Sequence, residues 1–319
     1  MKILITGSAG FIGYHLALKI LKSKKYKVFG IDNLDNYYSV KLKKKRLQIL
    51  KKFNNFKFKK TDILKEKKIQ NFFKKEKFDI VFHLAAQAGV RYSIINPKKY
   101  MQNNIQGFFN ILEAAKDNRI KRIIYASSSS VYGDCSIFPL KESQSLKAKN
   151  LYSLSKDFNE KLSLIYSNFN NLNLIGLRFF TAYGEFGRPD MMMMKYISCK
   201  LKGKPFFLYN FGNHFRDFTY IDDITEILNR LIKVRIKGKN EIYNVCSSKP
   251  VKITKVLKII DKYLPNKSII KKISMQKADV LKTFGSNNKI KKITKFRKFT
   301  SIEKGIKKLC TWVLKDKNF

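Results

Sequence analysis

Cysteine, histidine, proline and glycine are scarce in this sequence. Its 319 residues contain four Cys, three His, six Pro and 15 Gly. The cysteines stand far apart with no CxxC pair and the histidines are scattered, so we expect neither a disulfide framework nor a metal site. Few Pro and Gly exclude collagen-like and Pro-rich low-complexity chains. No run reaches the roughly 18 uncharged apolar residues of a membrane span, so membrane insertion is not expected either.

Acidic residues are also few, and this shortage leaves a formal net charge of +44. There are 23 Asp and Glu against 67 Lys and Arg, and only ten of the basic residues are Arg. The lysines are spread over residues 22–27, 41–45, 57–60, 65–77 and 289–295 and form no single stripe or tail. We interpret this as a compositional drift toward Lys and expect no specific nucleic-acid partner. A polyanion-binding or membrane-surface role stays open as the alternative.

The length and the start of the chain set its broad class. With 319 residues, 44% of them hydrophobic, the chain can bury roughly three quarters of its unfolded surface, so disorder is excluded. It opens on an apolar strand without a secretory leader, and its cysteines lack the pattern of secreted domains. We therefore expect a cytoplasmic protein.

Short apolar runs alternate with amphipathic stretches in the first half of the chain. This alternation predicts a doubly wound parallel sheet of the Rossmann type with crossover helices. Strands are expected at residues 2–6, 27–31, 56–59, 80–84, 122–127 and 174–179, and helices at 12–22, 67–75, 103–116 and 152–169. Beyond residue 178 the elements become short and are separated by Gly and Pro, which indicates a smaller lobe over the carboxyl edge of the sheet.

A glycine-rich turn, Thr6-Gly-Ser-Ala-Gly-Phe-Ile-Gly13, joins the first expected strand to the first helix. Gly7 permits the tight turn, Gly10 lets backbone N–H groups approach a pyrophosphate, and Gly13 lets the helix pack on the strand. Asp32 ends the second strand 19 residues after Gly13, where a carboxylate can bind a ribose diol. Because a carboxylate repels a 2′-phosphate, the pattern favours NAD over NADP. We expect the NAD-binding domain to span residues 1–178 and the α/β substrate lobe to span 179–319, with some segments returning to the sheet.

Tyr152 and Lys156 stand one helical turn apart, on one face of an expected helix. An ammonium group near a phenol favours the phenolate and so lowers the pKa of the tyrosine, which can then act as a base. The preceding strand ends in a run of serines, residues 127–130. A hydroxyl from that run could share a substrate proton with Tyr152.

With these motifs the sequence resembles the extended short-chain dehydrogenase/reductases, in the NAD-dependent epimerase/dehydratase family, and is most like the UDP-glucuronate 4-epimerases. The resemblance covers essentially the whole chain. Its motifs are the glycine turn, Ile31-Asp-Asn33, His83-Leu-Ala-Ala-Gln-Ala-Gly-Val-Arg-Tyr-Ser93, Tyr125-Ala-Ser-Ser-Ser-Ser-Val-Tyr-Gly133, Tyr152 to Lys156, Leu177-Arg-Phe-Phe-Thr181, Gly187-Arg-Pro-Asp-Met191 and Arg216-Asp-Phe-Thr-Tyr-Ile-Asp-Asp223.

The resemblance implies two sets of site residues. The family's NAD contacts fall on Gly7, Gly10, Phe11, Ile12, Gly13, Asp32, Asn33, Asp62, Ile63, Leu84, Ala85, Ala86, Asn103, Tyr152, Lys156 and Phe179. Its nucleotide-sugar contacts fall on Ser128, Thr181, Arg188 and Arg216, with Asp279 and Arg91 as further candidates. Arg216 is the expected ligand of the diphosphate, because a guanidinium can bind two oxygens at once.

The residues before Val-Tyr-Gly help to choose among the family's reactions. Related 4,6-dehydratases and decarboxylases carry acidic residues there, whereas this chain has Ser129 and Ser130. A hydroxyl cannot abstract the carbon-bound proton that elimination requires, so we expect the chemistry to stop at reversible oxidation and reduction. The expected reaction is C4 epimerisation of UDP-glucuronate to UDP-galacturonate through a transient 4-keto sugar, feeding polysaccharide synthesis.

The resemblance also implies roles for individual side chains. Tyr152 takes the proton of the sugar 4-hydroxyl with help from Ser128, and Lys156 holds the nicotinamide ribose and lowers the tyrosine pKa. Hydroxyls near Ser129 and Thr181 would hold the uronate carboxylate. The alternatives are a UDP-hexose or UDP-N-acetylhexosamine 4-epimerase and, more distantly, a non-catalytic polyanion-binding protein on the same fold. Relatives dimerise through the helices at residues 102–116 and 150–169, so we expect a homodimer.

Overall fold

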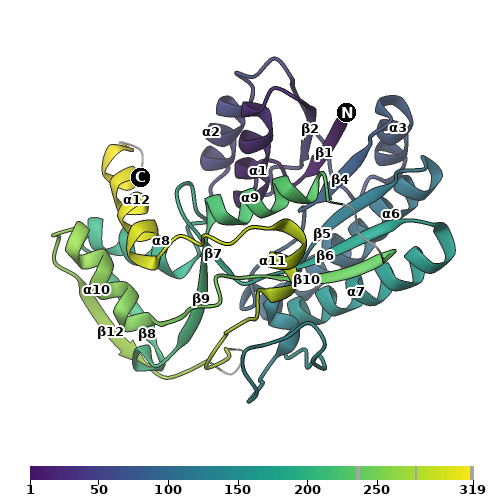
Figure 1. Cartoon of the computed structure of the whole chain (residues 1–319). Coiled ribbons are helices and arrows are strands. Elements are labelled where there is room, and N and C mark those ends of the chain that lie inside the picture. Colours follow the sequence, from purple (N-terminus) through teal and green to yellow (C-terminus); the bar gives the residue numbers. More distant parts are fainter. Residues whose placement is uncertain (235–237, 277–278, 317–319) are drawn as a thin grey trace.

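A seven-stranded parallel sheet forms the centre of the molecule in the computed structural model, which describes residues 1–234, 238–276 and 279–316 (Figure 1). The spatial order of the strands is β10-β6-β5-β4-β1-β2-β3. The chain therefore reverses its direction of winding between β1 and β4, and ligands of such sheets bind beyond the carboxyl ends of the strands at that point. The strands are β1 (Lys2–Thr6), β2 (Lys27–Asp32), β3 (Phe56–Lys60), β4 (Ile80–His83), β5 (Arg122–Ser128), β6 (Asn173–Phe179) and β10 (Asn240–Val245).

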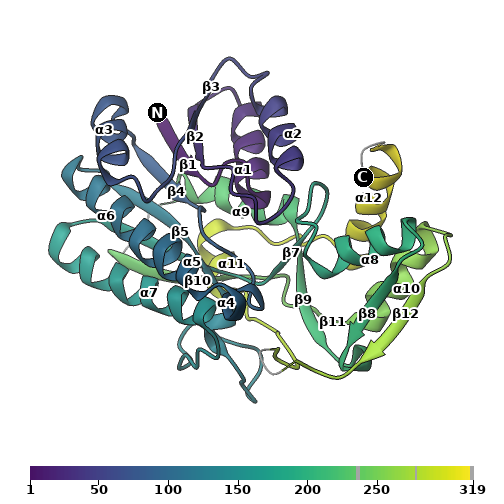
Figure 2. The same ribbon diagram turned by 180° about the vertical axis from the view of Figure 1, so that it is seen from behind.

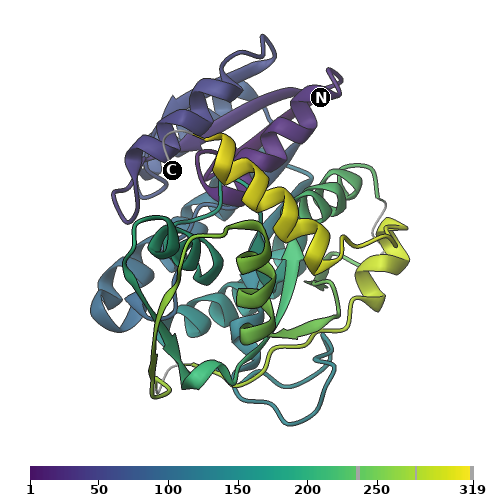
Figure 3. The same cartoon turned by 90° about the vertical axis from the view of Figure 1, so that its left-hand side faces the viewer.

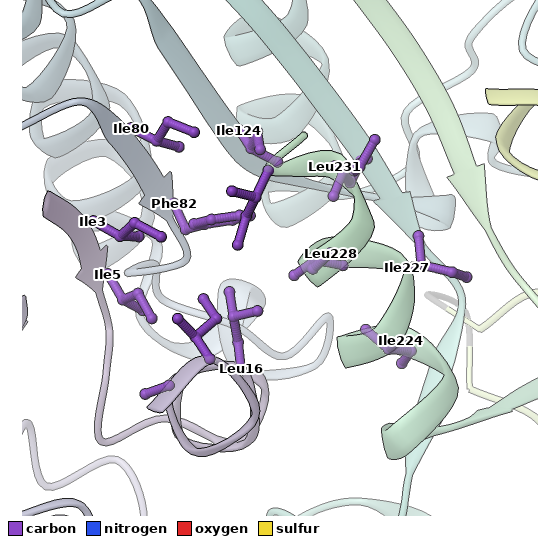
Figure 4. Close-up of a cluster of buried hydrophobic side chains, with 14 of the residues drawn as sticks. Ile3, Ile5, Leu16, Ile80, Phe82, Ile124, Ile224, Ile227, Leu228 and Leu231 are labelled. Atoms are coloured by element: carbon purple, nitrogen blue, oxygen red, sulfur yellow. The ribbon is translucent and has the colours of Figure 1, made fainter. Parts of the chain in front are cut away.

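Helices cover both faces of the sheet because its strands are apolar on both sides. Ile3 and Ile5 point to one face, where they belong to a hydrophobic cluster that also includes residues of α1 (Phe11–Lys22) and α9 (Ile221–Leu231), as Figure 4 shows. Leu4 points to the other face, where α3 (Glu66–Glu76), α6 (Gly107–Asp117) and α7 (Leu151–Asn170) lie (Figure 2). The predicted Rossmann-type α/β fold is confirmed, and every strand expected up to residue 179 is present.

Two helical regions differ from the prediction. The helix expected at residues 103–116 begins as a π-helix, η1 (Met101–Gln106), and continues as α6. Helix α2 (Val40–Leu50) was not predicted, because its run of lysines hides the amphipathic pattern. Short helices α4 (Tyr92–Ile95) and α5 (Pro97–Tyr100) lead into the π-helix.

The C-terminal half builds a smaller lobe beside the sheet (Figures 1 and 2). One small sheet has the order β11-β9-β7 and another pairs β12 with β8. These strands are β7 (Thr181–Tyr183), β8 (Pro205–Tyr209), β9 (Phe215–Tyr220), β11 (Pro250–Lys252) and β12 (Ile269–Ile273). The lobe's helices are α8 (Met192–Leu201), α10 (Ile253–Tyr263) and α12 (Ile302–Lys315).

Three later elements lie against the main sheet. Strand β10 extends it beside β6, and α9 and α11 (Asn288–Thr294) pack on the face that α1 covers. Helix α12, yellow in Figure 3, runs toward the purple N-terminal elements, where the Lys45 ammonium lies 2.6 Å from the Asp316 carboxylate.

The domain boundary at residue 178 stays a prediction. Among the described residues no helix is long and apolar enough to cross a membrane.

Candidate active site

The glycine turn between β1 and α1 is shaped by close backbone contacts. Gly7 has a φ of 69°, and its N–H donates to the Ile31 carbonyl at 2.8 Å. A Cβ on Gly13 would lie 2.2 Å from the Gly7 carbonyl oxygen, so α1 can pack this close to the turn only without a side chain there. No side chain of the described residues caps α1 at Gly10. Its first N–H groups are therefore available to an anion.

Asp32 lies beside this turn at the end of β2. Its carboxylate accepts hydrogen bonds from the N–H groups of Ala9 at 3.0 Å and Leu34 at 2.8 Å. Burial raises the pKa of Asp32, while these two bonds and the nearby cations oppose the rise. Next to it, the Asn33 amide donates to the Asp62 carboxylate at 2.9 Å.

The predicted reactive pair lies on the first turns of α7. Asn150 caps this helix, since its side chain accepts from the Ser153 N–H at 2.9 Å while the Ser153 hydroxyl accepts from the Asn150 N–H at 3.1 Å. Tyr152 and Lys156 follow one turn apart, as predicted, and both line the same cavity as Ser128 at the end of β5.

A buried ion pair holds α7 against the sheet one turn beyond Lys156. The Arg178 guanidinium of β6 donates to both Glu160 oxygens, at 2.9 and 2.7 Å. The Ser127 hydroxyl of β5 also donates to Glu160, at 2.5 Å. These charge-assisted bonds fix the helix relative to the strand ends that carry the serine run.

Burial shifts the pKa of both groups of the predicted pair. The Lys156 ammonium donates to the Ala126 carbonyl at 2.8 Å, and burial lowers the pKa of Lys156 to about 8. Burial also raises the pKa of Tyr152, which a hydrogen bond with Ser128 and the charge of Arg188 only partly offset. In the free protein the pKa of Tyr152 is therefore raised, because burial outweighs the groups that lower it. The lowering by Lys156 stays a prediction.

The cavity above the strand ends has a volume of about 460 Å³. Of the residues predicted for the site, all but Asp62 and Arg91 line it. Asp62 is connected to the lining through Asn33, and Arg91 lines an adjoining cavity of about 260 Å³. The two cavities share Thr181, Arg188, Arg216 and Asp279 among their walls. The described residues contain no group of three or more His, Cys, Asp or Glu side chains suited to a metal ion.

Three arginines gather where the cavities meet. Arg188 makes two bonds to the Asp190 carboxylate, at 3.0 and 2.5 Å. Arg216 donates to the Val280 carbonyl at 2.7 Å, and burial lowers the pKa of Arg216 to about 10. The third, Arg91, pairs with Asp279 at 2.8 Å. This concentration of guanidinium groups suits an anionic ligand.

Several cavity residues were missed by the sequence reasoning. Lys43 is buried, and its ammonium donates to the Asp35 carbonyl at 2.6 Å. It stands in a run of lysines, so nothing in the composition separates it from its exposed neighbours. His214, for which the sequence analysis gave no role, lines the smaller cavity. Asp190 lines neither cavity but pairs with Arg188; it lies within a recognised motif and could have been named.

Comparisons with known proteins agree with this geometry. The family model described as "NAD dependent epimerase/dehydratase family" matches residues 3–246. An uncharacterized protein from Methanocaldococcus jannaschii is 43% identical, with 99% of this chain and 97% of that protein covered. A UDP-glucuronate 4-epimerase from Thermodesulfobacterium geofontis is 37% identical, with 97% and 95% covered. The crystal structure of a UDP-glucuronic acid 4-epimerase from Bacillus cereus with UDP-glucuronic acid and NAD has a TM-score of 0.94 at 29% identity, with 99% of each chain covered.

Proposed function

The chain belongs to the NAD-dependent epimerase/dehydratase family, and from that membership we propose that it converts UDP-glucuronate to UDP-galacturonate by epimerisation at C4. One observation carries the proposal. Tyr152, Lys156 and Ser128 line one cavity with the glycine turn, and that cavity has Ser129 and Ser130 where elimination would need a carboxylate. The site residues carried over from the family are part of this proposal.

The first part of the cavity fits NAD. The Gly7 turn leaves no room for a side chain, since a Cβ there would lie 2.8 Å from the Ala85 nitrogen, and the Asp32 carboxylate stands where a ribose diol would bind. Bound NAD supplies an acceptor and donor for the C4 hydride. The first-turn N–H groups of α1 would hold its pyrophosphate, and Lys156 would hold the nicotinamide ribose.

The protein's own groups would move the hydroxyl proton. Tyr152 takes the proton from the sugar 4-hydroxyl, and Ser128 keeps the phenol and the hydroxyl in line by hydrogen bonding. Lys156 balances the charge of the phenolate. After the 4-keto sugar has turned its other face to the cofactor, the same three groups return the proton, which gives the epimer.

The uronate assignment is supported by polar residues that line the same cavity as the proposed reactive pair. Ser129, Ser130 and Thr181 line the cavity and offer hydroxyls to a carboxylate, and Arg188 offers a positive charge nearby. Holding the carboxylate in place matters, because a 4-keto uronate is a β-keto acid that readily loses CO2. A neutral hexose would leave these hydroxyls without an anionic partner.

Product analysis tests the proposal. The purified protein is incubated with UDP-glucuronate, UDP-glucose and UDP-N-acetylglucosamine in turn, and the sugar nucleotides are separated by chromatography. We expect UDP-galacturonate from the first and little turnover of the others. Turnover of UDP-glucose without turnover of UDP-glucuronate would replace the uronate assignment by a UDP-hexose 4-epimerase.

A homodimer formed through α7 is also part of the proposal. Leu154, Phe158, Ile165 and Phe169 are exposed along this helix, Phe169 to 83%. Their spacing places them on one face, and a continuous exposed apolar stripe of this kind indicates a helix–helix interface.

A cytoplasmic location suits the protein, because its four cysteines are free.

A further inference from the structure

His214 stands out among the residues that line the smaller cavity. It directly precedes β9, and only 5% of its surface is exposed. Its Nε2 atom has no hydrogen-bond partner among the described residues. A neutral imidazole carries its proton on one ring nitrogen, and in the tautomer with the proton on Nδ1 the Nε2 lone pair is free to take up a second proton. A buried, unpaired nitrogen is unfavourable unless a ligand completes it.

The charges around His214 come from three other segments. Burial lowers the pKa of the imidazole most, Arg216 on β9 and Arg91 before α4 lower it further, and Asp279 after β12 raises it. Arg188 is the remaining charged group in the cavity wall. In the free protein the imidazole is therefore neutral at neutral pH.

We propose that His214 takes up one proton when the substrate's diphosphate enters this cavity, and that Nε2 then donates it to a phosphate oxygen. The proposal rests on the proposed binding of a UDP-sugar. The diphosphate brings two negative charges next to Arg91 and Arg216, so the field that kept the imidazole neutral reverses and favours the imidazolium. The proton comes from solvent, and no covalent bond of the substrate changes.

The consequence is a binding affinity that depends on pH. Because the complex holds one proton more than the separate partners, binding strengthens as pH falls between the imidazole pKa values of the bound and free states. One linked proton limits the effect to about tenfold in Kd per pH unit. Asp279 reduces this pH dependence of Kd, because its carboxylate already raises the imidazole pKa in the free protein.

Calorimetry in buffers of different ionisation enthalpy measures the proton uptake directly. The protein is loaded with NAD and carries Tyr152→Phe to stop turnover, and the ligands are UDP-glucuronate and UDP-glucose. UDP-sugars are used because the terminal phosphate of free UDP would itself titrate near pH 6. We expect uptake approaching one proton per site and a Kd that falls about three- to tenfold from pH 8 to pH 6.

Two variants and one spectroscopic measurement decide the outcome. His214→Gln keeps a polar side chain that cannot titrate, so proton uptake and the pH dependence of Kd should both vanish. His15→Gln, which changes a histidine bonded to the Glu185 carbonyl, should leave both unchanged. Uptake that persists in His214→Gln overturns the proposal. Because the chain has only three histidines, the NMR signals of their rings can also be followed in the protein with native His214. A His214 imidazole that stays neutral when UDP-glucose binds would overturn the proposal as well.

The failure of this inference can be told apart from failure of the proposed function. Binding of UDP-glucose with uptake that depends on His214, but without turnover of UDP-glucuronate by the Tyr152-containing protein, removes the uronate assignment and keeps the role of His214. Turnover of UDP-glucuronate without such uptake removes only the role of His214. If no UDP-sugar binds, both are wrong.

Discussion

The number of protons held together by Tyr152 and Lys156 determines the pH dependence that we expect for turnover. The reactive form has Tyr152 ionised and Lys156 charged, which is one proton fewer than the fully protonated pair. Because burial lowers the pKa of Lys156 to about 8 and raises that of Tyr152, the pair loses its first proton near pH 8. We predict that kcat/KM rises about tenfold per unit below pH 8 and then levels off.

Rate measurements with two lysine variants check this origin of the profile. In Lys156→Met the rise should move to the pKa of Tyr152, above its ordinary value of 10.0. Lys161→Met removes an exposed lysine of the same helix, paired with Asp157 at 2.9 Å, and should leave the profile as it is. A native profile that is flat from pH 6 to pH 8 contradicts the prediction.

Replacing Tyr152 separates catalysis from cofactor binding. Tyr152→Phe removes the proposed base but only one of many groups around the cofactor, so we expect kcat to fall by about 10³ or more while NAD stays bound. Product chromatography gives the rate, and the nucleotide released by denaturation gives the NAD content. Tyr166→Phe removes another tyrosine hydroxyl of α7, which donates to Glu113 of α6, and serves as the control. Appreciable turnover by Tyr152→Phe would exclude this base.

At the residue scale the motifs were sufficient to select residues that line one cavity, but not to give the protonation of the proposed reactive groups. The i, i+4 spacing places Tyr152 and Lys156 together whatever surrounds them. Their pKa values depend on how deeply the cavity buries them, which no local pattern contains. For the same reason Lys43 was missed, because only tertiary packing distinguishes it from the lysines on either side.

Helix α2 connects two loops of the site through one buried arginine. The Arg46 guanidinium donates to the Ala9 carbonyl in the glycine turn at 2.6 Å and to the Phe186 carbonyl, just before Gly187 and Arg188, at 2.6 Å. Its side chain has no exposed surface. It therefore couples the loop proposed for NAD to the loop proposed for the sugar.

We predict that Arg46→Lys lowers the free energy of unfolding by about 2–4 kcal/mol, because one ammonium cannot reach both carbonyls and charge-assisted bonds contribute roughly 1.5–3 kcal/mol each. Urea unfolding followed by fluorescence of Trp312, which packs on Phe186, measures the change. Exposed Arg119→Lys should stay within about 0.5 kcal/mol of the native protein. Equal stability of the two variants would mean that Arg46 is not a structural link.

The exposed stripe of α7 gives a prediction about assembly. Phe158→Lys with Ile165→Lys should convert the proposed dimer to a monomer, since four apolar side chains per dimer each contribute roughly 1.5 kcal/mol or more when buried. Sedimentation velocity at micromolar concentration measures the state. The matched control, Phe207→Lys with Ile269→Lys, changes two similarly exposed residues on β8 and β12. A native protein that sediments as a monomer rules out the dimer.

At the element scale, predictability followed the strength of the apolar pattern. Central strands of the parallel sheet are buried on both faces, so they appear in the sequence as continuous apolar runs such as Ile3-Leu4-Ile5 of β1. In the smaller lobe, β7 and β11 have three residues each, too few to show a period. Their pairing with β9 depends on contacts between distant parts of the chain.

The lysines of the whole molecule lie almost entirely on its surface. Among the described residues, only Lys43, Lys156 and Lys200 are buried, and each has an oxygen partner. The remaining lysines therefore contribute a positive field around the molecule. The composition predicted the sign of this field but not where the charges lie. A field of this sign raises the local concentration of anionic ligands and their rate of encounter.

The positive field predicts a dependence of kcat/KM on salt that distinguishes capture of the substrate from the chemical step. A UDP-sugar carries at least two negative charges, so raising NaCl from about 25 to about 300 mM, which shortens the screening length to under 10 Å, should lower kcat/KM several-fold. The value of kcat should hardly change, because the buried groups around Tyr152 are screened much less. Initial rates across the salt series give both constants, and sodium and potassium chloride at equal ionic strength should act alike.

In the same series, affinity for a DNA duplex should vanish by physiological salt if attraction is non-specific. Specific polyanion binding would persist at physiological salt. In the kinetic experiment, a kcat/KM that does not depend on salt would show that the +44 charge does not aid capture of the substrate.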